Sequence, residues 1–253
     1  MRTAPLIATT AAMLLTMVPS LPAQSIADHV RSLADGQVRF SFAAREGVCG
    51  DGEHISTRRQ TEDWEGWCEA GPVRVALDVS EGVVIDLDTY VGGRWRERAS
   101  TEDLGMVSVN EATDYLLRLA ETASGDVSEH AIFPASLADS VVIWPRLLGM
   151  AKDERRPRET RKAAVFWLSM AAADVAVAEL GELAIESDTD IEVRKMALFG
   201  LSQLEDDQGV PVLLDVARTH QNHELRKQAI FWLGQTDDPR ALALFEEILT
   251  RRR

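Results

Sequence analysis

The stretch EVRKMALFGLSQ, from Glu192 to Gln203, decides the fold because closely related stretches occur on both sides of it. ETRKAAVFWLSM begins earlier in the chain, at Glu159, and ELRKQAIFWLGQ begins later, at Glu224. The shared pattern E-x-R-K-x-A-x-F-x-L places apolar residues at helical spacing. A nearly constant period of about 33 residues is typical of proteins built from repeated helical units.

A degenerate fourth copy precedes these three, because DVSEHAIF (Asp126 to Phe133) lies one period before the stretch that begins at Glu159. All copies share an alanine followed two residues later by a phenylalanine: Ala131 and Phe133, Ala164 and Phe166, Ala197 and Phe199, Ala229 and Phe231. A second apolar segment follows each copy in constant register, at Leu147, Leu180, Leu213 and Phe245. We therefore predict stacked helix pairs, in which the alanines permit close approach and the phenylalanines fill the space between layers.

This repeated phrase resembles the HEAT-like repeat family, in particular its short bacterial form named after phycobilin lyases. The resemblance covers about residues 108–253 and implies an α-solenoid of about four helix pairs. Proteins of this kind share a fold and differ in function, since many are interaction scaffolds and some are chromophore lyases. Residues 24–107 resemble no family in this way.

Between about Gly36 and Val107 the period of apolar residues is two instead of 3.6. One run alternates at Val73, Val75, Leu77 and Val79, and after a turn the next places Ile85, Leu87 and Val91 on one side. These runs predict a hairpin with one buried face, within a small antiparallel sheet. Ser108 and Glu111 then have the spacing of a capping box, which predicts a helix start. The expected fold class is α+β.

Residues 1–23 have the pattern of a cleaved secretory signal, with a basic start, an apolar segment from Leu6 to Val18 and small residues near Ala23. A retained membrane anchor is the alternative. We expect a periplasmic or secreted protein with a β-rich domain at 24–107 and a helical domain at 108–253. No later segment has the apolar run of a membrane span. Cys49 and Cys68, a pair in an exported chain, predict a disulfide.

The formal net charge of −14 argues against general binding to nucleic acid, which requires basic patches. Candidate partner-binding residues are therefore local: Arg155, Arg156, Arg158, Lys162, Lys195, Lys227, Trp167 and Trp232. The basic pairs of successive repeats could form a stripe for an acidic partner. We favour a structural interpretation, in which each arginine bonds to acids or carbonyls of the adjacent unit and each lysine is solvated. For the two tryptophans we favour packing over a groove that they flank.

No motif for nucleophilic catalysis or phosphate binding is present. One enzyme group with similar repeats, the deoxyhypusine hydroxylases, holds two irons with His-Glu dipeptides just after the repeat arginine. That dipeptide is missing after Arg161, Arg194 and Arg226, so di-iron chemistry is not expected. His220 and His223 could chelate a metal, but we favour a solvated turn. No cofactor is expected.

These observations leave two hypotheses on function. The first is an exported, non-catalytic module that binds a protein or peptide through its repeat surface. The alternative is a lyase-like enzyme or cofactor carrier, with a pocket between the sheet and the first repeat near Tyr115, His130 and Trp144. Within the central repeat, we expect Glu192 with Arg194 to link layers, and Lys195 and the position of Gly200 to be available to a partner.

Overall fold

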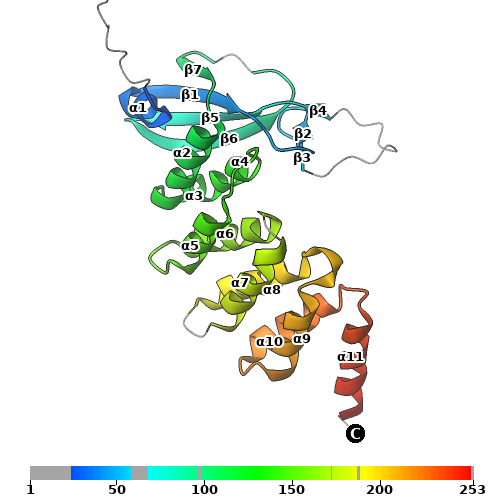
Figure 1. The fold of residues 1–253 in the computed structure, drawn as a ribbon. Coiled ribbons are helices and arrows are strands. Elements are labelled where there is room, and N and C mark those ends of the chain that lie inside the picture. Colours follow the sequence, from blue (N-terminus) through cyan, green and yellow to red (C-terminus); the bar gives the residue numbers. More distant parts are fainter. Residues whose placement is uncertain (1–23, 58–67, 96–97, 172, 187–188, 252–253) are drawn as a thin grey trace, which may run out of the picture.

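A computed structural model describes residues 24–57, 68–95, 98–171, 173–186 and 189–251. The predicted signal, residues 1–23, lies outside this range. The described chain begins with a short helix and a sheet and continues into a long succession of helices (Figure 1). The change in the period of apolar residues from two to 3.6 along the sequence predicts this order, with the sheet before the helices.

The main sheet has four strands in the order β6-β5-β1-β7. They are β1 (Asp35–Phe42), β5 (Val73–Ser80), β6 (Val83–Val91) and β7 (Thr101–Met106). β5 pairs antiparallel with both β1 and β6, which confirms the predicted hairpin. β7 runs parallel to β1 at the edge, so the sheet is mixed, and the predicted antiparallel pairing holds for β1, β5 and β6.

A β-bulge in β6 changes which of its residues face the core. Asp78 pairs with Asp86, but the next residue of β5, Val79, pairs with Val84. Ile85 is the extra residue, and 61% of its surface is exposed whereas Val84 is buried. The prediction that Ile85 belongs to the buried side was therefore wrong, because an inserted residue reverses the alternation of the strand beyond it.

Two helices, α1 (Ile26–Ser32) and α2 (Val109–Thr122), contact each other beside this sheet (Figure 1). The ring of Tyr115 in α2 meets the buried ring of Phe40 edge to face, with centroids 6.4 Å apart. The Ser108 hydroxyl caps α2 by accepting from the Glu111 N–H, as predicted. The Glu111 carboxylate does not complete the box, because it accepts from the Ile26 N–H at the start of α1.

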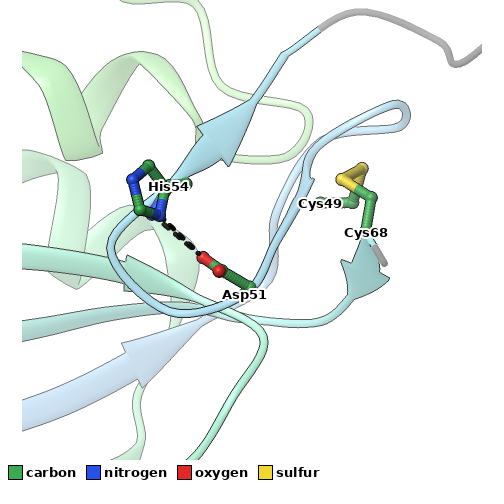
Figure 2. The surroundings of a disulfide bond; sticks show 4 residues. All are labelled: Cys49, Asp51, His54 and Cys68. Carbon is green, nitrogen blue, oxygen red and sulfur yellow. Dashed lines mark hydrogen bonds and ion pairs between the residues drawn. A yellow bond between two sulfur atoms is a disulfide. The ribbon is translucent and has the colours of Figure 1, made fainter. Parts of the chain in front are cut away.

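A second, smaller sheet carries the disulfide. Its strands are β2 (Cys49–Gly50), β3 (Ile55–Ser56) and β4 (Glu69–Ala70), in the order β3-β2-β4. Cys49 and Cys68 are bonded to each other, which confirms the predicted pairing (Figure 2). The turn between β2 and β3 includes Asp51 and His54, which contact each other.

The helical region contains the predicted pairs in the predicted register. Their bounds are α3 (Asp126–His130) with α4 (Ile132–Ser136) and α5 (Trp144–Lys152), α6 (Arg158–Ala171) with α7 (Ala173–Ile185), α8 (Ile191–Ser202) with α9 (Val210–Thr219), and α10 (His223–Leu233) with α11 (Pro239–Arg251). A short 3-10 turn, Glu205–Asp207, separates α8 from α9. The degenerate first copy is broken between α3 and α4, as expected where Pro134 lacks an N–H for the carbonyl of His130.

First helices of successive pairs contact one another, α4 with α6, α6 with α8 and α8 with α10. The four repeat alanines have no exposed surface, as predicted for positions of close approach. The leucines of the second helices, Leu147, Leu180 and Leu213, are equally buried. Among the described helices, none combines the length and apolar character that a membrane crossing requires.

Candidate functional site

The repeat phenylalanines and two tryptophans form one line of rings across the layers, which we call the aromatic row. It consists of Phe133, Trp167, Phe166, Phe199, Trp232 and Phe231. From α4 to α6, the rings of Phe133 and Trp167 stack with centroids 5.1 Å apart, and Trp167 meets Phe166 at 4.9 Å. From α6 to α10, the successive centroid distances are 6.1, 5.0 and 4.8 Å. Offset and edge-to-face pairs at these distances are favourable.

The aromatic row is only partly covered by other residues. Its members are half-buried, except Phe231 at the α10 end, which is 54% exposed. Met170, one turn after Phe166 on α6, is 50% exposed. The phenylalanines Phe133, Phe166 and Phe199 do contact rings of the neighbouring layer, as predicted, but they lie at the edge of the core and are not fully buried. The prediction that Trp167 and Trp232 pack is correct for one side of each ring, since both contact a ring of the preceding layer.

Gly200 does not open a groove between the two tryptophans. It is buried, and a β-carbon added there would lie 3.1 Å from Leu180 Cδ1 and 3.1 Å from Ser169 Cβ. The Leu180 side chain of the neighbouring pair thus fills the space. Gly200 is closed to a partner, and the expectation that this position is available was wrong.

A cavity of about 140 Å³ lies where the first helix pairs meet the segment after β1. Trp144, Trp167 and Met170 line it on the helical side and Arg45 on the other. Arg45 is held there by its backbone N–H, which donates to the Leu137 carbonyl at 2.8 Å. This junction cavity begins directly beside the aromatic row, because both include Trp167.

The junction cavity only partly matches the pocket expected from the sequence. Trp144 lines it, but His130 is exposed on α3 and does not. Tyr115 lies in the core against Phe40, and burial raises its pKa to about 12. Of the three residues proposed for a lyase-like pocket, one is in place.

The repeat arginines bond to main-chain carbonyls at the end of the preceding helix. Arg161 Nε donates to the Ala151 carbonyl at 3.0 Å, and Arg194 Nε to that of Ala184 at 3.1 Å. Arg226 Nη1 donates to the carbonyl at His220, 2.6 Å away. The last carbonyls of a helix lack partners within it and attract cations. These contacts are the structural role that we favoured for the arginines.

Ser128 makes the equivalent contact in the degenerate first copy, where it stands at the repeat position of the arginine. Its hydroxyl donates to the Ala120 carbonyl near the end of α2, at 2.6 Å, and lies 3.0 Å from the Thr160 hydroxyl. Arg156 donates to the neighbouring Glu121 carbonyl. Helix α2 thus takes the place of a second helix before the first pair. Sequence reasoning missed this contact, although the repeat alignment identifies the position.

The lysines of the repeat pairs are bonded within their own helices. Lys162 Nζ lies 2.8 Å from Glu159 Oε2, and Lys195 Nζ lies 3.0 Å from Glu192 Oε1. Glu192 therefore does not join Arg194 in a link between layers, and Lys195 is engaged instead of available. In the third copy Lys227 is exposed and, among the described residues, has no such pair.

The basic loop before α6 is also paired with acids. Arg155 and Arg156 both lie within 3.2 Å of Asp153, and Arg158 lies 3.0 Å from Asp190 in the next layer. Exposed pairs of this kind contribute little to stability, because water screens them. The two aspartates offset most of the positive charge of these three arginines, which weakens the idea of a basic stripe for an acidic partner.

His220 lies between two hydrogen-bond donors. Arg194 Nη2 lies 2.7 Å from His220 Nε2 and the Asn222 backbone nitrogen lies 3.0 Å from His220 Nδ1, and a neutral imidazole accepts at only one of its two nitrogens. Burial and the charge of Arg194 lower the pKa of this imidazole. The predicted solvated turn is correct for the exposed His223 but wrong for His220. Among the residues that the structure describes, no group of metal-ligand side chains gathers.

This environment predicts a pH dependence of folding. Above about pH 6.5 His220 is neutral in both the folded and unfolded states. As the pH falls below that value the unfolded chain takes up the proton first, so the free energy of unfolding decreases towards the lowered pKa of the folded state. We expect His220→Asn to lose less stability than the wild type between pH 7.5 and pH 5.5 in urea titrations. Equal losses in the two proteins would contradict the lowered pKa.

A family profile of HEAT repeats matches residues 177–253. The match covers most of α7 and the two helix pairs after it, and so includes the arginine contacts of Arg194 and Arg226. No curated protein and no solved structure matches the chain. The C-terminal helical region is thus similar to HEAT repeats, as the sequence pattern indicates.

Proposed function

We propose that this protein is an exported, non-catalytic binding module in which an α-solenoid of the short bacterial, phycobilin lyase-type class presents the aromatic row to a protein partner. HEAT repeats commonly mediate protein–protein interaction, and the profile match supports such a role for the C-terminal region. The observation that carries the proposal is the aromatic row itself. It crosses every layer and stays only partly buried, although fully buried rings would stabilise the fold more.

The exposed ends of the aromatic row indicate how a partner would bind. Met170 beside the junction cavity and Phe231 on α10 leave about half of their surface in water. Large apolar and aromatic side chains in this state are typical anchor points of interfaces. The lysines one turn before the phenylalanines, Lys162 and Lys195, are already paired with glutamates, so apolar contact dominates recognition.

The partner that fits this surface is an extended protein segment with apolar side chains at intervals. One of these side chains would enter the junction cavity, and the others would pack on the aromatic row. A cavity of about 140 Å³ accepts one side chain, and is smaller than the roughly 300 Å³ at which ligand pockets begin. The net charge of −14 favours a neutral or basic segment over an acidic one. Because this volume is too small for a cofactor of ordinary size, it gives less support to the alternative that the protein carries a cofactor.

Export is supported by the disulfide between Cys49 and Cys68, which is typical of oxidising compartments, and by the N-terminal sequence pattern. The periplasm or the medium is the proposed location. N-terminal sequencing of the protein from those fractions should begin at Gln24. Recovery of the intact chain only from the cytoplasm would refute export.

A selection from a random peptide library tests the binding surface. We expect the selected peptides to carry spaced aromatic or aliphatic residues. The variant Met170→Ser with Phe231→Ser should bind them at least tenfold more weakly, because about 1.4 kcal/mol of lost contact is enough for that change. Fluorescence anisotropy with a labelled peptide measures the dissociation constants.

The matched control is Val83→Ser with Ile85→Ser, which also removes two exposed apolar side chains but lies on β6 of the sheet. This control should bind the peptides like the wild type. Equal binding by the Met170 and Phe231 variant would show that the row is not the site. Loss in both double variants would indicate a nonspecific apolar effect.

A further inference from the structure

A second cavity, of about 270 Å³, lies on the face of the main sheet that is opposite to the core, and we call it the sheet cavity. Val38 and Leu77 pair across β1 and β5 and have no exposed surface. Successive side chains of a strand point to opposite faces, so the residues next to them, Gln37 and Ala76, belong to the other face. Both line the cavity, which includes none of the residues assigned to partner binding.

Two aromatic rings form part of the wall, and cations hold one of them in place. The rings of Tyr90 and Trp95 meet edge to face, with centroids 5.7 Å apart. The guanidinium carbons of Arg39 and Arg74 each lie 5.0 Å from the centre of the Trp95 ring, within the range of cation–π contact. Neither arginine is part of the cavity wall, so both serve to position the ring.

The charged groups of the wall offset one another. Two carboxylates, those of Asp51 and Glu53, stand against two guanidinium groups, those of Arg94 and Arg98. Arg98 is in addition paired with Asp78 of β5, at 3.2 Å. A ligand with a net charge of either sign would meet groups of the same sign in this wall. The wall therefore favours a neutral ligand and offers it both hydrogen-bond donors and acceptors.

Ala76 provides the space at the floor of the sheet cavity. Its neighbours on the same face of β5 are Arg74 and Asp78, and both have larger side chains. The methyl group of Ala76 leaves room that a longer side chain at this position would fill.

The loop that closes the cavity is fixed against the sheet. Gly52 exchanges both backbone hydrogen bonds with Val91, at 2.8 and 3.0 Å. The disulfide closes the same loop, and the Asp51 carboxylate accepts from the His54 backbone N–H (Figure 2). Gly93 has a φ of +65° and passes so close to Asp51 that a side chain there would collide with its carbonyl. The fold itself therefore forms the cavity.

We propose that the sheet cavity binds a neutral sugar, which packs against the rings of Trp95 and Tyr90 and bonds through its hydroxyl groups to the polar wall. A sugar ring has a face of C–H groups, which suits an aromatic side chain, and hydroxyl groups that both donate and accept. The Asp51 carboxylate and the Arg94 guanidinium supply an acceptor and donors for these hydroxyl groups.

The size of the sheet cavity fits one sugar unit. Its volume of about 270 Å³ is close to the roughly 300 Å³ at which small-molecule pockets begin, and about twice that of the junction cavity. The site is separate from the aromatic row, so either proposal can fail alone.

Isothermal titration calorimetry of the full chain tests the ligand class. The probes are the neutral methyl glycosides of glucose, galactose, mannose and N-acetylglucosamine. We expect at least one of them to bind with saturation at one site, and the tightest identifies the sugar. Glucuronate and glucosamine, which carry a negative and a positive charge, should bind about tenfold more weakly. No saturable binding of any neutral glycoside, or equal or tighter binding of a charged sugar, would overturn the proposal.

Two substitutions of Ala76 locate the site. Ala76→Leu fills the floor but keeps every polar group and both rings of the wall, so the affinity for the sugar should fall by about tenfold or more. Ala76→Ser adds a single oxygen atom, and as the matched control it should bind like the wild type. Unchanged affinity in Ala76→Leu would place the sugar elsewhere and refute the assignment.

The variant Trp95→Ala gives a second test that leaves the floor intact. We expect a loss of about tenfold in affinity, because the sugar loses its largest apolar contact. The control is Trp144→Ala, which removes a tryptophan from the junction cavity and should leave the affinity for the sugar unchanged. Equal losses in the two variants would contradict a sugar site at Trp95.

Discussion

Leu180→Ala is expected to lower the free energy of unfolding by about 3 kcal/mol. Leu180 has no exposed surface and lies in α7, where its Cδ atoms occupy the space beside Gly200 of α8. Truncation to alanine leaves a cavity between two helix pairs, and packed interiors collapse only partly around such a loss. Urea unfolding followed by circular dichroism at 222 nm measures the change.

Gly200→Ala in the Leu180→Ala background should recover part of this loss. In the wild type the added methyl group meets Leu180 Cδ1 at 3.1 Å, so the close contact opposes the gain of about 1 kcal/mol in helix propensity. When Leu180 is truncated, the contact with Ser169 Cβ at 3.1 Å remains, but the methyl group enters space that the leucine side chain has left. We expect a coupling energy of at least about 0.5 kcal/mol in the double-mutant cycle.

Leu147→Ala is the matched control for this cycle, because Leu147 is the equivalent buried leucine of α5 in the preceding pair. Gly200→Ala should not rescue Leu147→Ala. Strictly additive effects of Leu180→Ala and Gly200→Ala would mean that the two residues do not share space between the layers.

Removal of the disulfide by Cys49→Ser with Cys68→Ser should cost about 3 kcal/mol in the stability of the sheet region. The bond joins residues 19 apart, and in the chain-entropy account its loss frees this loop in the unfolded state.

Near-ultraviolet circular dichroism during urea unfolding measures the change, because its signal comes from packed aromatic rings, among them Tyr90 and Trp95 beside the sheet. Wild-type protein reduced with dithiothreitol is the control and should unfold at the midpoint of the double serine variant. An unchanged midpoint in both would show that backbone hydrogen bonds alone hold the loop. A loss only in the serine variant would indicate a packing effect of the substitutions.

The repeat made much of the helical region predictable. Positions that recur, such as Ala164 and Ala197, can be assigned to close contacts from the sequence alone, because one packing solution must serve every layer. The same reasoning gave the arginines a structural role, and Arg161 and Arg194 do bond to the preceding layer. A residue that recurs at the same position of every repeat therefore indicates a packing role common to all layers.

The partial exposure of the aromatic row was not predicted, although the sequence contained the necessary information. Phe166 follows Ala164 by two residues, which is about 200° around a helix of 3.6 residues per turn. Two such residues cannot face the same core, so a buried Ala164 places Phe166 near the opposite surface. Recurrence alone was interpreted as burial, whereas the angular position within the helix decides it.

Other features had no local signal. The bulge at Ile85 depends on its pairing with β5, and the parallel pairing of β7 with β1 joins strands far apart in sequence. Arg74 reads as the polar member of an alternating strand, and only the tertiary structure shows that Trp95 covers it. Each of these features depends on contacts between segments that are far apart in the sequence. The conformational propensity of a single segment gives no information about such contacts.

The end of α2 has a consequence for how such a protein can change over evolution. The contacts from Ser128 and Arg156 reach main-chain carbonyls at Ala120 and Glu121, whereas Tyr115 contacts the sheet through its side chain. Main-chain atoms are the same for every amino acid. The side chains of α2 can therefore diverge to suit a different N-terminal region while these hydrogen bonds to its main chain persist. The N-terminal sheet could thus be replaced during evolution without loss of the contacts between α2 and the first helix pair.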